Sequence, residues 1–211
     1  YTSIENIHKV IDPLFMNELR EEFKEIQMLK TVVRKKERLE ELQNKMASLK
    51  FLDPAAGSGN FLTETYISLR KLENDILKEL YDSQIMMGEL HNPIKVSINQ
   101  FYGIEINDFA VSVARTALWI AESQMMKKTE NIVNIDLDFL PLKTYPNIVE
   151  DNALRMNWED VVQKHELNYI MGNPPFYGAR MQTKDQKAEI KEVYHGAKNC
   201  GNIDYVAGWY I

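Results

Sequence analysis

Apolar residues recur at three- and four-residue steps between positions 14 and 50, and charged residues of both signs fill the remaining positions. This spacing predicts amphipathic helix. One uninterrupted helix of that length would be unusual, so we expect a break near Lys30–Arg34. The segment is either a solvated helical pair packed on the rest of the domain, or an arm that reaches a neighbouring domain or DNA through Lys35, Lys36 and Arg38. The apolar positions are Leu19, Phe23, Ile26, Leu29, Val33, Leu39, Leu42, Met46 and Leu49.

Beyond residue 50, short apolar runs alternate with longer stretches of helical periodicity. Short apolar strands separated by helices are typical of a parallel sheet whose two faces are both covered, so the sequence predicts an α/β fold. Asp108 can cap the second helix of this part. The expected strands are 50–53, 101–105, 132–135, 147–150 and 167–171, and the expected helices are 60–81, 108–126 and 183–194.

The bulk composition is that of an ordinary globular protein. Hydrophobic residues make up 45% and charged residues 27% of the 211 positions. No apolar run approaches the roughly 18–20 residues needed to span a bilayer, and no signal peptide is visible. The single cysteine, Cys200, excludes an internal disulfide and fits a reducing compartment. We therefore expect a cytoplasmic protein.

Histidine content and net charge limit the candidate chemistry. The four histidines are scattered without the spacing of metal ligands, so no metal site is predicted. The net charge of −6 is unfavourable for a nucleic-acid protein, because neutralising phosphates requires clustered lysine and arginine. If DNA is the substrate, most of the grip on its backbone must come from a part of the protein outside this chain.

A glycine-rich turn lies between the first expected core strand and its helix, where residues 53–61 read Asp-Pro-Ala-Ala-Gly-Ser-Gly-Asn-Phe. Gly57 and Gly59 allow the backbone to approach a ligand closely, and the helix that follows offers free N–H groups. The Rossmann GxGxxG pattern and the lysine of a P-loop are both absent. Asp53, at the strand end, repels phosphate and attracts an amine. The ligand is therefore expected to carry a cation near Asp53 and no phosphate.

The next expected strand of the core ends in Glu105. A carboxylate at the end of the neighbouring strand can accept hydrogen bonds from both hydroxyls of a ribose. An amine beside Asp53 and a ribose beside Glu105 together describe S-adenosylmethionine. A plain tight turn and a solvated strand end are the structural alternatives for these two features.

A second motif, Asn173-Pro174-Pro175-Phe176, follows the apolar stretch 169–172. Two consecutive prolines fix φ and remove two backbone donors, so this segment is a rigid loop. The prolines leave carbonyls free, Asn173 adds a side-chain amide, and Phe176 adds a flat apolar face. Two acceptors beside a stacking plate suit a planar ring with an exocyclic amine, such as a nucleobase taken out of its helix. A purely structural turn is the alternative interpretation.

Together these motifs resemble the amino-methylating class of S-adenosylmethionine-dependent DNA methyltransferases. Residues 53–61 look like the cofactor motif of that class, and residues 173–176 look like its catalytic motif in the adenine-specific form. The order of the motifs, with Tyr1-Thr2-Ser3 before the glycine turn, is that of the gamma class. The resemblance extends to the MmeI-like branch of type IIG restriction-modification enzymes, in which nuclease, methyltransferase and target recognition share one polypeptide. It covers nearly the whole chain.

The resemblance implies two sets of site residues. The catalytic set is Asn173, Pro174, Pro175 and Phe176. The cofactor-binding set is Tyr1, Thr2, Asp53, Pro54, Ala55, Gly57, Gly59, Phe61, Glu105, Ile106, Asp151 and Asn152. Within this set, the N-terminal pair closes over the methionine end of the cofactor, and Ile106 covers its adenine ring. Asn152, or alternatively Asp151, accepts from the amino group of that ring.

The resemblance also implies a class I, Rossmann-like methyltransferase fold and an organisation of the chain. Residues 1–50 would form an N-terminal cofactor-capping segment and a charged helical arm, and residues 51–211 a partial methyltransferase core. We expect the mostly parallel sheet to be truncated after the fourth strand, and the chain to be an inactive fragment of a longer polypeptide. The implied activity is methylation of a flipped adenine in double-stranded DNA, with nuclease and target-recognition domains elsewhere in the same polypeptide.

Two other functions fit the same motifs. Enzymes that methylate guanine amines of ribosomal RNA, or a glutamine amide of release factors, share the Asn-Pro-Pro motif, because their acceptor is likewise a planar amine or amide. The release-factor type usually has Asp-Leu-Gly-Thr-Gly-Ser-Gly in its cofactor loop, unlike residues 53–59 here. As an isolated fragment, the chain could also be a cofactor-binding module without activity.

Overall fold

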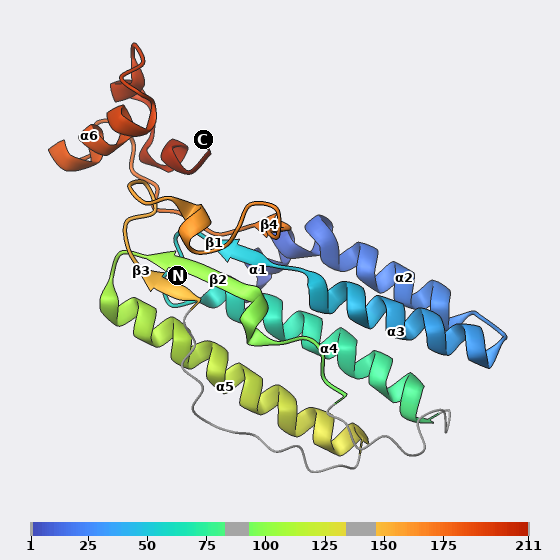
Figure 1. Cartoon of the computed structure of the whole chain (residues 1–211). Helices are drawn as coiled ribbons and strands as arrows, with labels where there is room; N and C mark the ends of the chain where they lie inside the picture. Colours follow the sequence, from blue (N-terminus) through green and yellow to red (C-terminus); the bar gives the residue numbers. More distant parts are fainter. Residues whose placement is uncertain (1, 83–92, 134–146, 211) are drawn as a thin grey trace.

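A computed structural model describes residues 2–82, 93–133 and 147–210 of the chain. Its centre is a four-stranded sheet with the order β3-β2-β1-β4, in which every pair of neighbours is parallel. The expected α/β fold with a parallel sheet is thereby confirmed (Figure 1). The strands are β1 (Phe51–Asp53), β2 (Phe101–Glu105), β3 (Ile148–Glu150) and β4 (Tyr169–Ile170).

Two long helices cover one face of this sheet. α4 (Asn60–Asp82) packs on β1 and β2, and α5 (Asp108–Val133) packs on β2 and β3, so that the two helices lie side by side (Figure 1). The opposite face is covered by the chain that follows β3, through a smaller apolar cluster that includes Leu52, Ile104 and Val162.

α5 begins at Asp108 as expected, but its capping residue differs from the sequence expectation and it extends to Val133 rather than ending at residue 126. Ala110 N donates to the Asn107 side-chain oxygen at 2.9 Å, so Asn107 rather than Asp108 caps the helix. The expected strand at 132–135 is wrong where it can be compared, because Ile132 and Val133 are the last residues of α5 and residues 134 and 135 lie outside the described residues.

The N-terminal segment forms helices that pack beside the sheet and α4. α1 (Ile4–Ile11) continues through a short π-helical stretch, Asp12–Met16, into α2 (Asn17–Gln27), and α3 (Val32–Ser48) follows. The break between α2 and α3 falls at residues 28–31, as the periodicity predicts. The cations proposed for a DNA-binding arm are engaged in the domain itself, which favours the packed helical pair. Their partners are Glu79 for Lys35 (2.6 Å), Glu40 for Lys36 (3.8 Å), and Glu22 and Glu41 for Arg38 (3.2 and 2.9 Å).

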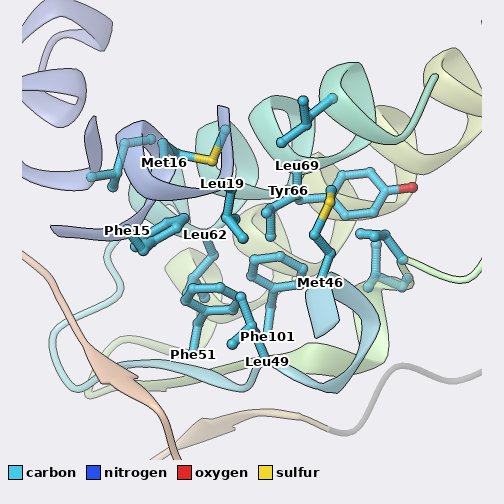
Figure 2. Close-up of a cluster of buried hydrophobic side chains, with 14 of the residues drawn as sticks. Phe15, Met16, Leu19, Met46, Leu49, Phe51, Leu62, Tyr66, Leu69 and Phe101 are labelled. Carbon is cyan, nitrogen blue, oxygen red and sulfur yellow. The ribbon is translucent and has the colours of Figure 1, made fainter. Parts of the chain in front are cut away.

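The main hydrophobic core joins the N-terminal helices to the sheet. The Phe51 ring of β1 stacks on Phe101 of β2 at 5.1 Å, and Phe15 lies 5.2 Å from Phe51 (Figure 2). The other neighbour of Phe51 in the sheet, Tyr169 of β4, stacks on it at 5.5 Å. All but Tyr169 are fully buried. The N-terminal helices therefore share one core with the sheet.

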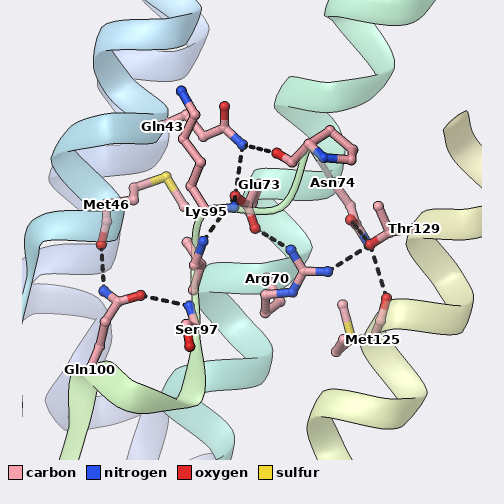
Figure 3. Close-up of polar contacts among 12 residues, drawn as sticks. Gln43, Met46, Arg70, Glu73, Asn74, Lys95, Ser97, Gln100, Met125 and Thr129 are labelled. Carbon is pink, nitrogen blue, oxygen red and sulfur yellow. Dashed lines mark hydrogen bonds and ion pairs between the residues drawn. The ribbon is translucent and has the colours of Figure 1, made fainter. Parts of the chain in front are cut away.

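A buried polar network ties α3, α4 and α5 together (Figure 3). The Arg70 guanidinium of α4 forms an ion pair with Glu73 and donates to the Thr129 hydroxyl of α5 at 2.7 Å. The other Glu73 oxygen accepts from the Gln43 amide of α3 at 2.7 Å and from the Lys95 N–H at 2.7 Å. Because a buried charge is stable only when paired and hydrogen-bonded, this network fixes how the three helices pack.

The remaining described elements are short. They are 3₁₀ turns at Ile98–Gln100, Trp158–Asp160, Cys200–Asn202 and Tyr205–Tyr210, and the helix α6 (Lys184–Val193), which a Thr183–Gln186 capping box begins. Among the described helices, none is long and apolar enough to cross a membrane.

Candidate active site

The carboxyl ends of the four parallel strands meet at one edge of the sheet, and a segment singled out in the sequence follows each of them. The glycine turn follows β1, Glu105 ends β2, Asp151 follows β3, and the loop containing Asn173 follows β4. This is the edge at which open α/β sheets bind ligands. The pairing of the parallel strands therefore brings the candidate residues together at one edge of the sheet.

The first and last of these segments touch. Met171 N donates to the Leu52 carbonyl at 2.9 Å, which holds the end of β4 against β1. A Cβ atom at Gly172 would lie 2.3 Å from the Asp53 Oδ1 atom, so only glycine allows this approach. The glycine turn and the Asn-Pro-Pro loop thus open on the same face of the molecule.

Hydrogen bonds from the turn itself hold the two carboxylates. Ala55 N donates to Asp53 Oδ1 at 3.0 Å. Gly57 N donates to Glu105 Oε2 at 2.8 Å, and Asn107 N donates to Glu105 Oε1 at 3.0 Å. Each carboxylate oxygen has two lone pairs, so these bonds orient Glu105 and leave it capacity to accept from a ligand.

The two glycines of the turn have different roles. Both adopt positive φ, +53° at Gly57 and +77° at Gly59. Nothing lies within 4 Å of a Cβ added at Gly57, whereas one added at Gly59 would meet the Ala114 Cβ of α5 at 2.9 Å. Gly57 therefore serves the conformation of the turn, and Gly59 also serves the packing of the turn on α5.

Asp53 is the electrostatically unusual group of the site. It is 1% exposed, and burial raises its pKa to about 7, with Glu105 adding to the rise and the Ala55 N–H opposing it. A buried carboxylate with this pKa gains most from a cationic partner, because a cation offsets the cost of its charge. Perturbed carboxylates of this kind cluster at functional sites.

Two adjoining hollows lie along the strand ends. The smaller has a volume of about 130 Å³ and the larger about 390 Å³, and Ala55 and Asn173 line both. The smaller is lined by Thr2, Asp53, Ala55, Ala56, Gly57, Ser58, Asn60, Phe61 and Asn173. The larger is lined by Pro54, Ala55, Ile104, Glu105, Ile106, Asp151, Asn152, Ala153, Asn173, Pro175, Tyr177, Gln186, Tyr205 and Trp209. Asn173 therefore borders both hollows and stands at their junction.

The two candidates for binding an adenine amino group are in different situations. The Asn152 side chain is engaged at both ends, since its Nδ2 donates to Glu189 at 2.8 Å and its Oδ1 accepts from Leu154 N at 2.9 Å. Asp151 is exposed at the larger hollow, and its Oδ1 accepts from Asn152 N at 2.7 Å. The geometry favours Asp151 as the acceptor with free capacity.

The loop after β4 presents its side chains to the open side of the site. Asn173 is exposed, and its Nδ2 donates to the Thr2 hydroxyl oxygen at 3.1 Å. Phe176 is 72% exposed, which is unusual for a large apolar ring and suits a partner that stacks on it. Pro174 and Phe176 line neither hollow, and neither does Gly59; Tyr1 lies outside the described residues.

The C-terminal segment supplies a wall that the sequence did not predict. Trp209 Nε1 donates to the Pro54 carbonyl at 3.2 Å, and the Tyr205 hydroxyl donates to Glu189 at 2.5 Å. Both rings line the larger hollow, together with Tyr177. Nothing in the spacing of these aromatic residues pointed to the site, because their position depends on the chain folding back after α6.

A parallel sheet in this order, with a glycine turn after β1 and an Asn-Pro-Pro loop after β4, defines a Rossmann-like methyltransferase architecture. Comparison with known proteins agrees. Residues 29–211 match the family described as "MmeI, DNA-methyltransferase domain", and the chain belongs to that family.

Individual relatives are similar over the whole chain or part of it. DNA methyltransferase A of Bacillus subtilis (strain 168) is 41% identical over 213 residues, which cover 100% of this chain and 23% of that protein. The type IIL restriction-modification enzyme MmeI, solved in complex with DNA, superposes with a TM-score of 0.90 at 38% identity, covering 100% of this chain and 27% of that one. A putative type II restriction enzyme and methyltransferase of Methanocaldococcus jannaschii is 31% identical over 78 residues, 37% of this chain and 6% of that protein. The chain thus spans about a quarter of the length of the first two relatives.

Proposed function

We propose that this chain is the methyl-transferring part of a restriction-modification enzyme, and that it moves a methyl group from S-adenosylmethionine to the exocyclic amine of adenine in DNA. The observation that carries the proposal is the position of Asn173 at the junction of the two hollows. A group bound along the strand ends and a base entering from the open side would meet there. Membership of the MmeI methyltransferase family supports the same reaction class.

The residues along the strand ends fit S-adenosylmethionine. The buried Asp53 carboxylate faces the smaller hollow and suits the ammonium group of a methionine moiety. Glu105, at the larger hollow, suits ribose hydroxyls, and Ile106, which is 66% exposed, offers an apolar cover for a purine. Asp151 would accept from the purine amino group, while Asn152 holds the loop in shape.

When bound, S-adenosylmethionine supplies a methyl group made electrophilic by the attached sulfonium. The amine of adenine is a poor nucleophile, because its lone pair is delocalised into the ring. The Asn173 side-chain oxygen and the Pro174 carbonyl would accept its two N–H bonds and draw the nitrogen towards tetrahedral geometry. Fixed acceptors aimed at developing positive charge are a form of electrostatic preorganisation, and holding both reactants in line supplies the entropic part.

The exposed Phe176 ring would hold the target base outside the duplex. Flipping a base costs a few kcal/mol, and stacking on an aromatic side chain recovers about 1–3 kcal/mol. A restriction-modification enzyme of this kind would grip the duplex through other domains of the same polypeptide, as the net charge of −6 on this chain requires.

Methyl transfer to DNA adenine is tested with the full-length polypeptide and S-adenosylmethionine carrying a labelled methyl group. Duplex DNA, RNA and protein serve as acceptors, and the labelled DNA is then hydrolysed to nucleosides. We expect the label in N6-methyladenine. Label in cytosine, in RNA or in protein would refute the adenine assignment in favour of one of the related amine methyltransferases.

Cofactor binding is tested separately by calorimetric titration of the same polypeptide. Asp53→Ala and Glu105→Gln should each weaken binding at least tenfold, and the glutamine keeps an acceptor for Gly57 N. Glu150→Gln is the matched control, because Glu150 pairs in register with Glu105 on the next strand but lines neither hollow. Undiminished binding by the first two variants would place the cofactor elsewhere. A module without activity would bind the cofactor and transfer nothing.

A further inference from the structure

We propose that Thr2 is a positioning residue for Asn173: its hydroxyl fixes the plane of the Asn173 side-chain amide, in which the amide oxygen can face the target amine. The inference rests on the proposed function and adds to it a role for the N-terminal segment beyond enclosing the cofactor. The proposal rests on a hydrogen bond between Thr2 and Asn173, two residues that are 171 positions apart in the sequence.

The contact is between the Asn173 Nδ2 and Thr2 Oγ1 atoms, at 3.1 Å. Asn173 is exposed, and the torsion that turns an asparagine amide about its Cβ–Cγ bond is broad, so packing does not fix its orientation. Within the part of the chain that the structure describes, this is the one side-chain hydrogen bond found for Asn173. Thr2 is thus the group available to hold the amide still.

The planar amide places its oxygen and nitrogen on opposite branches. With Nδ2 directed at Thr2, Oδ1 is directed away from Thr2. A hydroxyl can either accept or donate, so Thr2 alone does not choose between the two ends of the amide. The target amine determines which end of the Asn173 amide faces it, because the amine presents N–H donors and binds productively only to Oδ1. Thr2 therefore sets the plane, and the substrate sets which end is used.

Thr2 is itself held in place by the helix that follows it. Ser3 caps α1, accepting from Asn6 N at 3.4 Å, and its carbonyl accepts from Ile7 N at 3.0 Å. One turn on, the His8 ring bridges Asp12 at 3.1 Å and Glu64 of α4 at 3.1 Å. The helix α1, which begins just after Thr2, is therefore tied to α4, the helix that begins directly after the glycine turn.

The test uses Thr2→Val, which keeps the shape of threonine but removes the hydroxyl, and Thr2→Ser, which keeps the hydroxyl. Both are made in the full-length polypeptide, and kcat for methyl transfer is measured separately from the Kd for S-adenosylmethionine. We expect Thr2→Val to lower kcat about five- to tenfold, the effect of one hydrogen bond, with a smaller change in the Kd because valine keeps the shape that encloses the cofactor, and Thr2→Ser to restore most of kcat. Thr116→Val, at an exposed threonine of α5, is the matched control and should leave both unchanged.

A double-mutant cycle distinguishes positioning from a separate contribution. In an Asn173→Ser background, followed under single-turnover conditions, Thr2→Val should have no further effect on the rate, because the amide that Thr2 positions is gone. The same fold loss in both backgrounds, or a raised cofactor Kd with unchanged kcat, would overturn the role of Thr2. Failure of the wild type to methylate DNA adenine would instead overturn the proposed function itself.

Discussion

Replacing Asp53 with asparagine should stabilise the folded chain at pH 8 and at the same time remove much of its affinity for S-adenosylmethionine. Asp53 is 1% exposed and accepts one backbone hydrogen bond, from Ala55 N, a bond that the asparagine oxygen can keep. The charge of Asp53 is unfavourable in the empty site and favourable once a cation lies beside it. Stability and binding should therefore change in opposite directions.

The size of the stability effect follows from the pKa of Asp53, which burial raises from 3.8 to about 7. At about 1.4 kcal/mol per pKa unit, holding the carboxylate charged costs the folded state about 4 kcal/mol. Between these two pKa values the folded state keeps a proton that the unfolded state has released. The free energy of unfolding contributed by Asp53 therefore falls as pH rises from about 4 to about 7 and is constant above that.

Urea unfolding of the wild type and Asp53→Asn at pH 5 and pH 8, followed by circular dichroism, measures this difference. The advantage of the variant should be about 3 kcal/mol larger at pH 8 than at pH 5, because about two pH units of the titration lie between them. Asp151→Asn is the matched control, because it makes the same substitution at a strand end where the carboxylate is exposed. An equal advantage at both pH values, or a less stable variant at pH 8, would refute the reasoning.

In the wild type, cofactor affinity should fall about tenfold per pH unit below pH 7.

Five further substitutions have expected outcomes. Gly59→Ala should destabilise the fold by about 3 kcal/mol or more, because its Cβ would lie 2.9 Å from the Ala114 Cβ of α5. Gly57→Ala has open space around it and should cost only the strain of positive φ, about 1–2 kcal/mol. The midpoints of urea unfolding compare the two variants. Glu73→Gln should cost about 3–5 kcal/mol in the same assay, because it leaves the buried arginine of the polar network without its counter-ion. Phe176→Ala should mainly weaken binding of the flipped base, measured by 2-aminopurine fluorescence, while Asn173→Ala should mainly lower the methylation rate. If both variants lost base binding and methylation rate equally, these separate roles would be contradicted.

The sheet and its helices could be predicted because their signals are local. Short apolar runs gave β1 and β2, and three- and four-residue periodicity gave the helices and the break between α2 and α3. The error at residues 132 and 133 has a physical cause. Its apolar residues favour a strand by propensity, but Met125, Thr129 and Val133 are buried at four-residue steps and continue the packed face of α5. Tertiary packing on α4 outweighs that propensity.

The cap of α5 shows that the sequence can leave two adjacent residues equally suited to cap a helix. Asn107 and Asp108 are adjacent, and both are side chains that favour an N-cap. The structure uses the first to accept from Ala110 N, while Asp108 accepts from the N–H of the next residue at 2.6 Å. Composition alone identifies the helix start to within one residue, and the path of the chain leaving β2 decides between the two candidates.

The site was predictable in its motifs and not in the contacts between them. Asp53, Glu105 and Asn173 could be placed at strand ends from the sequence, since each follows an apolar run. The bond from Asn173 to Thr2 and the one from Trp209 to Pro54 could not, because they join segments far apart in the chain. Those long-range contacts define the two hollows as much as the motifs do.

The choice between Asn152 and Asp151 shows what such contacts add. From the sequence, both could accept from an adenine amino group. The buried Glu189 of α6 accepts from Asn152 and from Arg155 at 2.9 Å, and it also accepts the Tyr205 hydroxyl. Asn152 therefore links the loop after β3 to the C-terminal wall. The Asn152 side chain would have to break a partly buried bond to turn towards a ligand, whereas the exposed Asp151 carboxylate can accept from one with no such loss. These contacts favour Asp151 as the side chain with free capacity to accept, and Asn152 as a residue that holds the wall of the larger hollow.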